Sequence, residues 1–427
     1  MSWDRWYSIK SYLRSTLWLV PFVALLFYVV VIQALDWINA RFIVIPLWPW
    51  GTSGAQRILE TIVTLTLTFI VFTFGSLLVA IQVASGQLTP RIIATALLRD
   101  NVIRITVGIF IFTLLFSVGV LGRLEAEAPF FLVGIAGILG FASLIAFLYL
   151  IDHAARLLRP VSIVRRIGDL GCDVIENVYP DLFDGRDLHT DTRRTLNRPD
   201  RTILYGGKSG VILAVNQKAL VKEAHRFGLV IELTQRVGSF LESGEPLFRL
   251  YGDAAKIENR PFLQNVAIGP ERTIEQDSTF AFRIIVDIAI KALSKAINDP
   301  TTAVLAIDQL NRLLRKVGER RLHGDQVLDK SGQLRLILQT PSWEDFVQLA
   351  VREIRFYGAE NFQVARRLRA MLENLLHTLD EERHSALRAE LNLLDDAVKI
   401  IHVLPADLAL ASIADPQGLG AGFAHRV

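Results

Sequence analysis

Cysteine is nearly absent from this chain, and its scarcity limits both the chemistry and the compartment. The single cysteine of the 427 residues is Cys172, so the chain can form no internal disulfide and no cysteine-based metal cluster. The eight histidines are scattered, and none has a sequence neighbour at metal-ligand spacing. We therefore predict no metal site, and a reducing compartment for the part of the chain outside any membrane.

The short motifs of the common enzyme classes are also missing. No phosphate-binding loop, no G-x-G-x-x-G opening a strand–helix unit, no H-E-x-x-H and no G-x-S-x-G occurs. The 46 basic and 43 acidic residues give a net charge of only +3, spread along the chain. We predict no catalytic residue, no cofactor, no enzyme activity and no nucleic-acid partner.

Long apolar runs dominate the first third of the chain. Hydrophobic residues make up 51% of the sequence and charged residues only 21%, and a membrane-spanning helix needs about 20 apolar residues. An interfacial helix rich in aromatic and basic residues is predicted at 1–16, followed by a transmembrane domain at 17–151. Its four predicted spans are 17–35, 58–83, 102–121 and 130–151.

Basic residues in the short loops predict the orientation. They concentrate in the N-terminal segment, in the loop that holds Arg91 and Arg99, and after the fourth run. The positive-inside rule places these segments, and both termini, in the cytoplasm. We therefore expect a multi-pass protein of the bacterial inner (plasma) membrane.

Polar and small residues recur on one face of the second span, and two interpretations remain open. Such residues either form the contact surface between packed helices or line a polar path across the membrane. Near the membrane surface, three further residues either bind a lipid headgroup or an anion, or act as ordinary interfacial anchors. The face comprises Thr61, Thr64, Thr68, Gly75 and Gln82, and the surface residues are Arg91, His153 and Arg156.

The rest of the chain is predicted to be a cytosolic α+β domain. A juxtamembrane helix at 152–180, kinked at Pro160, precedes a charged linker at 181–201. The pattern at 202–253 is similar to the barrel-sandwich repeat of biotinyl and lipoyl carrier domains, but Glu242 and Ser243 stand where those domains carry a modifiable lysine. This β module is therefore predicted to be structural or a docking module. A helical domain at 254–403 and a disordered tail at 404–427 complete the prediction.

Two helices of this domain are expected to meet at a polar elbow. Helical periodicity covers 278–298 and 300–314, Asp299 can cap the second helix, and Pro300 fits its first position. The elbow either holds an anion or effector or is a capped bend that satisfies its own backbone. Its polar residues are Asp287, Ser294, Asn298, Asp299, Thr301 and Thr302.

Three segments carry a family resemblance: IQVASGQLTPRI, GPERTIEQD and DIAIKALSKAINDPTTA. With them the chain resembles a bacterial family of predicted integral membrane proteins, domain of unknown function 2254, over most of its length. The chain departs from the family's common RALSPAINDP pattern at Lys291 and Lys295. The resemblance implies a four-span membrane part and a cytosolic domain, with no established activity.

Two functions compete on this basis. The first is an oligomeric channel or transport-type protein in the lipid bilayer, with a regulatory cytosolic domain and an unidentified small-molecule or ion ligand. Because Glu60 and Arg104 lie at span ends and no acid or lysine lies deeper, a passive pore is favoured over proton-coupled transport. The second is a membrane-anchored sensor or scaffold that binds an effector or a protein. An enzyme acting on lipid headgroups near His153 and Arg156 lacks a nucleophile–base pair.

Overall fold

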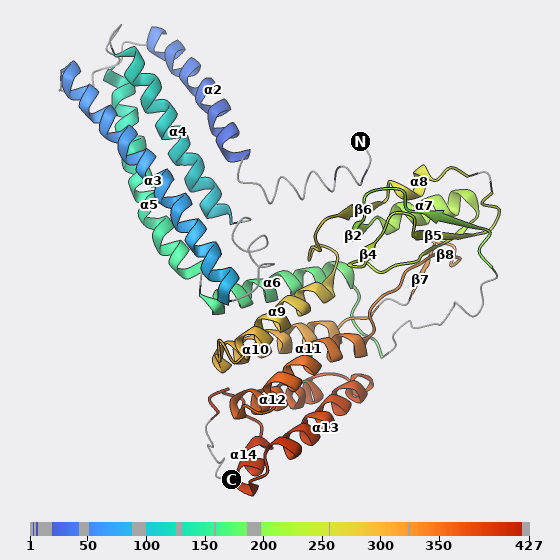
Figure 1. The fold of residues 1–427 in the computed structure, drawn as a ribbon. Coiled ribbons are helices and arrows are strands. Elements are labelled where there is room, and N and C mark those ends of the chain that lie inside the picture. Colours follow the sequence, from blue (N-terminus) through green and yellow to red (C-terminus); the bar gives the residue numbers. More distant parts are fainter. Residues whose placement is uncertain are drawn as a thin grey trace. The chain divides into compact units, whose positions relative to one another are not determined.

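The computed structural model divides the chain into two compact units (Figure 1). The membrane unit is Tyr12–Ile163, and the C-terminal unit combines Met1–Ser11 with Val164–Val427. The described residues are 3, 6, 19–41, 51–87, 100–124, 130–157, 159–185, 198–255, 257–322 and 325–420.

Long apolar helices build the membrane unit: α2 (Leu19–Arg41), α3 (Thr52–Gln87), α4 (Asn101–Arg123) and α5 (Phe130–Leu157). Three stretches in the described residues are long and apolar enough to cross a membrane, namely Thr52–Val79, Asn101–Arg123 and Phe131–Arg156. In α2 the apolar stretch found is shorter, Val23–Ala34. The described residues thus contain three candidate spans where the sequence predicts four, and the remaining span, predicted at 17–35, stays a prediction.

Helix α4 is the centre of this unit, in contact with α2, α3 and α5. Two apolar clusters hold the helices together. One includes Leu59, Phe116 and Leu132, and the other includes Phe69 and Phe110. The largest of these side chains are fully enclosed, so the helices pack directly against one another.

The C-terminal unit contains a group of helices whose starts follow from their capping residues. Asp277, Asp299, Ser342 and Asn361 each accept a backbone N–H of the helix that follows. The helices are α6 (Pro160–Val178), α9 (Ser278–Ala292), α10 (Pro300–Gly318), α11 (Trp343–Gly358), α12 (Phe362–Thr378), α13 (His384–Ile401) and α14 (Pro405–Ala411).

Two sheets form the β part of the same unit. The larger has the order β1-β5-β3-β8-β7 and the smaller β4-β2-β6; β3 and β8 pair in parallel, and the other pairs are antiparallel. The strands are β1 (Arg201–Leu204), β2 (Gly210–Val215), β3 (Val230–Leu233), β4 (Phe240–Leu241), β5 (Pro246–Tyr251), β6 (Val266–Gly269), β7 (Gln326–Leu328) and β8 (Leu334–Ile337). The short helices α7 (Gln217–Phe227) and α8 (Arg260–Leu263) accompany them.

The barrel-sandwich module predicted at 202–253 is not confirmed. Its strands β2 and β3 and helix α7, ended by Gly228, are present. However, β4 and β5, on either side of the Ser243–Gly244 turn, pair in different sheets. Strand β3 pairs with β8 and β2 with β6, both beyond residue 253. The predicted module recruits strands from outside its bounds, so the two sheets belong to one larger α+β unit.

Two boundaries also differ from the sequence-based prediction. Helix α5 ends at Leu157 and α6 begins at Pro160, so Pro160 starts a new helix instead of kinking one, as suits a residue without an N–H group. The tail predicted to be disordered begins with α14, and Asp415 then accepts the backbone N–H groups of Gln417, Gly418 and Gly420. Of the predicted linker, residues 186–197 lie outside the described residues.

Trp3, near the start of the sequence, belongs to the C-terminal unit. It packs against the small sheet, beside Leu213 and Ala214 of β2 and Ala267 of β6. The sequence predicted an interfacial helix for this segment. Of that segment only Trp3 and Trp6 are described.

Candidate functional site

A buried carboxylate marks the start of α4. Asp100 accepts the backbone N–H groups of Val102 and Ile103 at 2.9 and 3.2 Å, which explains why the helix begins there. The same oxygen, Oδ1, lies 3.1 Å from Nε2 of His153 in α5. Asp100 is only 5% exposed, whereas the His153 side chain is 20% exposed. The pair therefore joins a buried acid to an imidazole that solvent or headgroups can reach.

Buried hydroxyl groups also lie along α4 and α5 of the membrane unit. Thr106, Thr113 and Ser117 share the buried face of α4 at a spacing of seven and four residues. The Ser143 hydroxyl of α5 donates to Thr113 Oγ1 at 2.9 Å, and both residues are fully buried. The Ser117 hydroxyl is also fully buried, and no hydrogen-bond partner is found for it in the described part of the chain.

Helix α3 adds two further buried hydroxyls, which are satisfied within the helix. Thr66 Oγ1 donates to the Ile62 carbonyl at 2.6 Å, and Thr73 Oγ1 donates to the Phe69 carbonyl at 2.7 Å. We call the whole set the polar seam. It comprises Thr66, Thr73, Asp100, Thr106, Thr113, Ser117, Ser143 and His153.

An aromatic layer interrupts the polar seam. The Phe69 ring stacks on the Phe147 ring at 4.2 Å, and the Phe110 ring lies 5.7 Å from Phe69 and 6.4 Å from Phe147. Phe110 lies between Thr106 and Thr113 along α4, and Phe69 lies between Thr66 and Thr73 along α3. The layer therefore separates two levels of hydroxyl groups.

The polar face predicted on the second span lies elsewhere on α3. In the part of the chain that the structure describes, these residues are exposed, which favours a surface facing lipid or another copy over a contact between helices of the same chain. The Thr61, Thr64 and Thr68 hydroxyls donate to the carbonyls of Arg57, Glu60 and Thr64 at 2.7 to 2.8 Å. A pore lined by Thr61, Thr64, Thr68, Gly75 and Gln82 would require several copies of the chain, and stays a prediction.

The predicted surface residues separate into two groups. His153 belongs to the polar seam through Asp100. Arg156 instead forms an ion pair of 2.5 Å with Asp152, and both side chains are exposed. Arg91 lies outside the described residues. Asp100 escaped the sequence analysis because a carboxylate before an apolar run also fits an ordinary helix cap.

The elbow residues satisfy one another. Asp299 caps α10 through Thr302 N at 3.1 Å and also accepts the Thr302 hydroxyl, as the sequence predicts. Thr301 is exposed, and α9 ends at Ala292, not at Asn298. The Ser294 hydroxyl donates to the Lys291 carbonyl at 2.7 Å.

The remaining elbow residue, Asp287, belongs to a different group. Its carboxylate accepts Arg283 Nε at 2.7 Å, and the same guanidinium reaches Glu353 of α11. These contacts favour the capped-bend interpretation of the elbow over a binding site for an effector.

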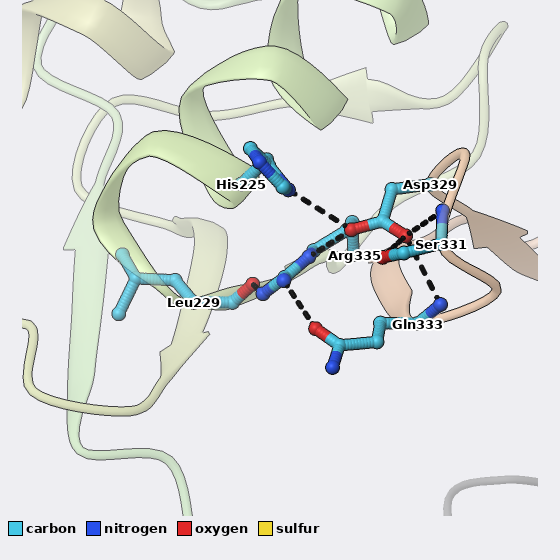
Figure 2. Close-up of polar contacts among 6 residues, drawn as sticks. All are labelled: His225, Leu229, Asp329, Ser331, Gln333 and Arg335. Atoms are coloured by element: carbon cyan, nitrogen blue, oxygen red, sulfur yellow. Dashed lines mark hydrogen bonds and ion pairs between the residues drawn. The ribbon is translucent and has the colours of Figure 1, made fainter.

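A second carboxylate cluster ties the β7–β8 turn to α7 (Figure 2). Asp329 accepts the Ser331 N–H and hydroxyl at 2.9 and 2.6 Å, Arg335 Nε at 2.7 Å, and the Gln333 N–H at 3.1 Å. His225 Nδ1 of α7 lies 3.1 Å away. The Ser331 hydroxyl, followed by Arg335, holds the pKa of Asp329 well below its usual value. These contacts indicate that Asp329 has a structural role, holding the β7–β8 turn against α7. We call this group the Asp329 clamp.

Comparison with known proteins identifies the family. Residues 14–374 match the family described as predicted membrane protein, domain of unknown function 2254. The chain belongs to this family. DUF2254 relatives include an uncharacterized protein of Mycobacterium bovis and two of Mycobacterium tuberculosis. Each is 26% identical over 402 residues, which cover 90% of this chain and 77% of the relative. No solved structure matches this DUF2254 protein significantly.

Proposed function

We propose that this DUF2254 protein is a transport-type membrane protein whose route follows the polar seam. The observation that carries the proposal is the fully buried Ser117 hydroxyl, for which the described residues provide no partner. Inside a bilayer an unsatisfied polar group is costly. Serine at this place would therefore lower stability relative to alanine, unless the hydroxyl has another use.

Helix packing is the competing explanation of the seam. Thr66 and Thr73 donate to their own helix, and Ser143 bonds to Thr113 across α4 and α5, as polar residues do when they hold membrane helices together. The contact between Asp100 and His153 likewise links α4 to α5. Packing does not account for the Ser117 hydroxyl, for which no partner is found among the described residues. A route for a permeant species gives that hydroxyl a role.

The same proposal includes four spans, with both termini in the cytoplasm. Trp3 packs on strands β2 and β6, which follow the last span in sequence, so an even number of crossings must lie between them. Among the described residues, three helices qualify as spans by length and hydropathy. In the proposal α2, at 23 residues, supplies the fourth. The positive-inside rule then selects the cytoplasmic side of the inner membrane.

Flux through reconstituted liposomes tests the transport function. Vesicles containing the purified protein should release K⁺, protons or a small osmolyte faster than empty vesicles. Thr113→Val combined with Ser117→Ala should lower that flux by about tenfold. Ser76→Ala is the matched control and should leave the flux unchanged, because Ser76 is exposed on α3 and belongs to neither the polar seam nor the predicted pore-lining face. Flux equal to that of empty vesicles for all three probes would overturn the proposal.

We further propose that the protein is a homo-oligomer that uses an apolar patch on the C-terminal unit. The ends of α11 and α13 lie together there, because His402 Nε2 is 3.1 Å from the Ala359 carbonyl. Val403 and Ile400 are 83% and 79% exposed, and an apolar cluster of this kind usually marks an interaction site. Six exposed apolar residues near these helix ends are grouped as the proposed patch: Phe356, Tyr357, Ile400, Ile401, Val403 and Leu404.

The mass of the purified protein in detergent tests this second proposal. Light scattering should give a multiple of the 47.8 kDa chain mass, and Ile400→Glu with Val403→Glu should reduce it to one chain. Leu328→Glu, at an exposed apolar position on β7, is the matched control. A chain that is monomeric without any substitution would refute assembly through this patch. In that case the patch would support the alternative function of a membrane-anchored scaffold that binds a different protein.

A further inference from the structure

We infer that the species passing along the polar seam is the proton, with the Asp100–His153 pair as its entry. This inference rests on the proposed transport function and names its substrate. The proposed conduction is passive. Its acidic residue, Asp100, lies at the start of α4, so the proposal requires no acidic residue in the middle of the membrane.

The close packing of the seam argues for the proton over larger species. Thr113, Ser117 and Ser143 are fully buried, and so are Phe110 and Phe116 beside them. A hydrated ion or an osmolyte would have to separate α3, α4 and α5, which are in direct contact with one another. A proton needs only hydroxyl groups and single water molecules that bridge them.

The entry pair has the chemistry that proton uptake requires. A carboxylate and an imidazole 3.1 Å apart can both exchange protons, and the imidazole is the more exposed of the two. Charged residues flank both members of the pair in sequence. Arg104 of α4 is four residues after Asp100, and Asp152 and Arg156 of α5 flank His153. Asp152 and Arg156 pair with each other, so neither is the partner of His153.

The hydroxyl groups supply the steps beyond the entry. At each step an oxygen gains a proton on one side and releases a proton on the other, so one O–H bond forms as another breaks and only charge moves. Ser143 and Thr113 already form one such link at 2.9 Å. The enclosed Ser117 hydroxyl supports the route separately from this link. No partner is found for it among the described residues, so it can bond to a water molecule in the route.

The aromatic layer is the barrier in this pathway. Phe69, Phe110 and Phe147 form a dry contact between the two levels of hydroxyl groups, and apolar constrictions close channels by excluding water. Conduction therefore requires water to enter this layer transiently. We expect a slow proton leak in the resting protein.

Proton flux into liposomes under an imposed pH gradient tests the inference. A pH-sensitive dye reports the flux, and valinomycin with K⁺ on both sides removes any opposing potential. The full-length protein should conduct protons, and Asp100→Asn should reduce the rate at least tenfold while keeping the helix cap, because asparagine caps as well as aspartate. Ser117→Ala should lower the rate similarly, and Ser76→Ala, at an exposed position of α3 outside the seam, should leave it unchanged.

The outcomes separate this inference from the proposed function. K⁺ or osmolyte flux without proton flux would keep the transport function and overturn the proton as its substrate. No flux of any probe would overturn both. Proton flux that neither Asp100→Asn nor Ser117→Ala alters, with both variants folded by circular dichroism, would show that protons do not use this seam.

Discussion

Asn298 combines a strained backbone with an exposed side chain. Its φ of +48° is the one positive value among the non-glycine residues that the structure describes, and it lies just before the Asp299 cap. Asparagine tolerates this conformation better than most residues, and β-branched residues tolerate it poorly. The strain belongs to the bend between α9 and α10, which the sequence located correctly at Asp299-Pro300.

Substitutions at Asn298 should therefore change stability in opposite directions. We expect Asn298→Gly to leave the free energy of unfolding unchanged or to raise it slightly, and Asn298→Val to lower it by about 1–2 kcal/mol. Denaturant unfolding of the purified protein measures both. Lys295→Ala, at an exposed neighbouring position, should change stability by less than about 0.5 kcal/mol. Equal stability of the valine and glycine variants would show that the bend is not strained.

The Asp329 clamp predicts a dependence of stability on acid pH. Because the pKa of this carboxyl is lowered in the folded protein, its contribution is complete above the ordinary carboxyl pKa of about 4 and is lost as the pH falls further. Asp329→Asn should lower the melting temperature at pH 7, and the difference from the unaltered chain should shrink toward pH 3. Asp253→Asn, at an exposed position of the same unit, is the control. A difference that stays constant with pH would contradict this account.

At the scale of elements, α6 packs closely on α9 and α10 because two of its residues are glycines. A Cβ atom at Gly171 would lie 2.9 Å from Ala281 Cβ and from a methyl group of Leu313. At Gly168 it would meet only the end of the flexible Gln309 side chain. The neighbours of Gly171 are packed side chains that cannot easily move aside, whereas the Gln309 side chain beside Gly168 can.

These two glycines make a matched pair of substitutions. Gly171→Ala should lower the free energy of unfolding by about 1–3 kcal/mol through overpacking. Gly168→Ala should cost less than about 1 kcal/mol, because alanine favours the helix by a similar amount. Thermal unfolding of the two variants gives the comparison. A Gly168→Ala variant as unstable as Gly171→Ala would mean that Gln309 cannot give way.

The sequence predicted helices more reliably than sheets, for a physical reason. Caps such as Asp299 and Ser342, and the end signal Gly228, act within a few residues, so local patterns locate them. The partners of β2 and β3 lie beyond residue 253, and no local pattern reveals such pairing. The sequence predicts a disordered tail because its composition is rich in Ala and Gly. That composition does not indicate the bonds that Asp415 accepts from backbone N–H groups in this segment.

The candidate site was predicted only in part. The face of the second span that the sequence predicts to be functional is exposed in the structure, whereas Thr66 and Thr73 of the same helix are buried. Both faces of α3 carry threonines at helical spacing, and hydropathy does not distinguish a lipid-facing threonine from one that faces another helix. The pairing of Thr113 with Ser143 requires the relative rotation of α4 and α5, which is a property of packing.

At the scale of the whole molecule, the orientation can be measured by cysteine labelling. Burial raises the pKa of the Cys172 thiol, so this residue should react slowly in the folded protein. In a Cys172→Ala background, Glu127→Cys should react with a membrane-impermeant maleimide in intact spheroplasts, whereas Lys208→Cys should react only after lysis. Labelling of both in intact spheroplasts would contradict the crossing by α5 that separates them, and the reverse pattern would contradict the predicted orientation.

The packing of Trp3 on the small sheet has a consequence for biosynthesis. Strands β2 and β6 follow helices α2 to α5 in the sequence, so during synthesis Trp3 acquires these neighbours only after those helices have been made. Until then the surface on which Trp3 packs does not exist. A nascent chain arrested before β6, or a variant whose small sheet is disrupted, would leave Trp3 without this contact even if helices α2 to α5 were correctly inserted in the membrane.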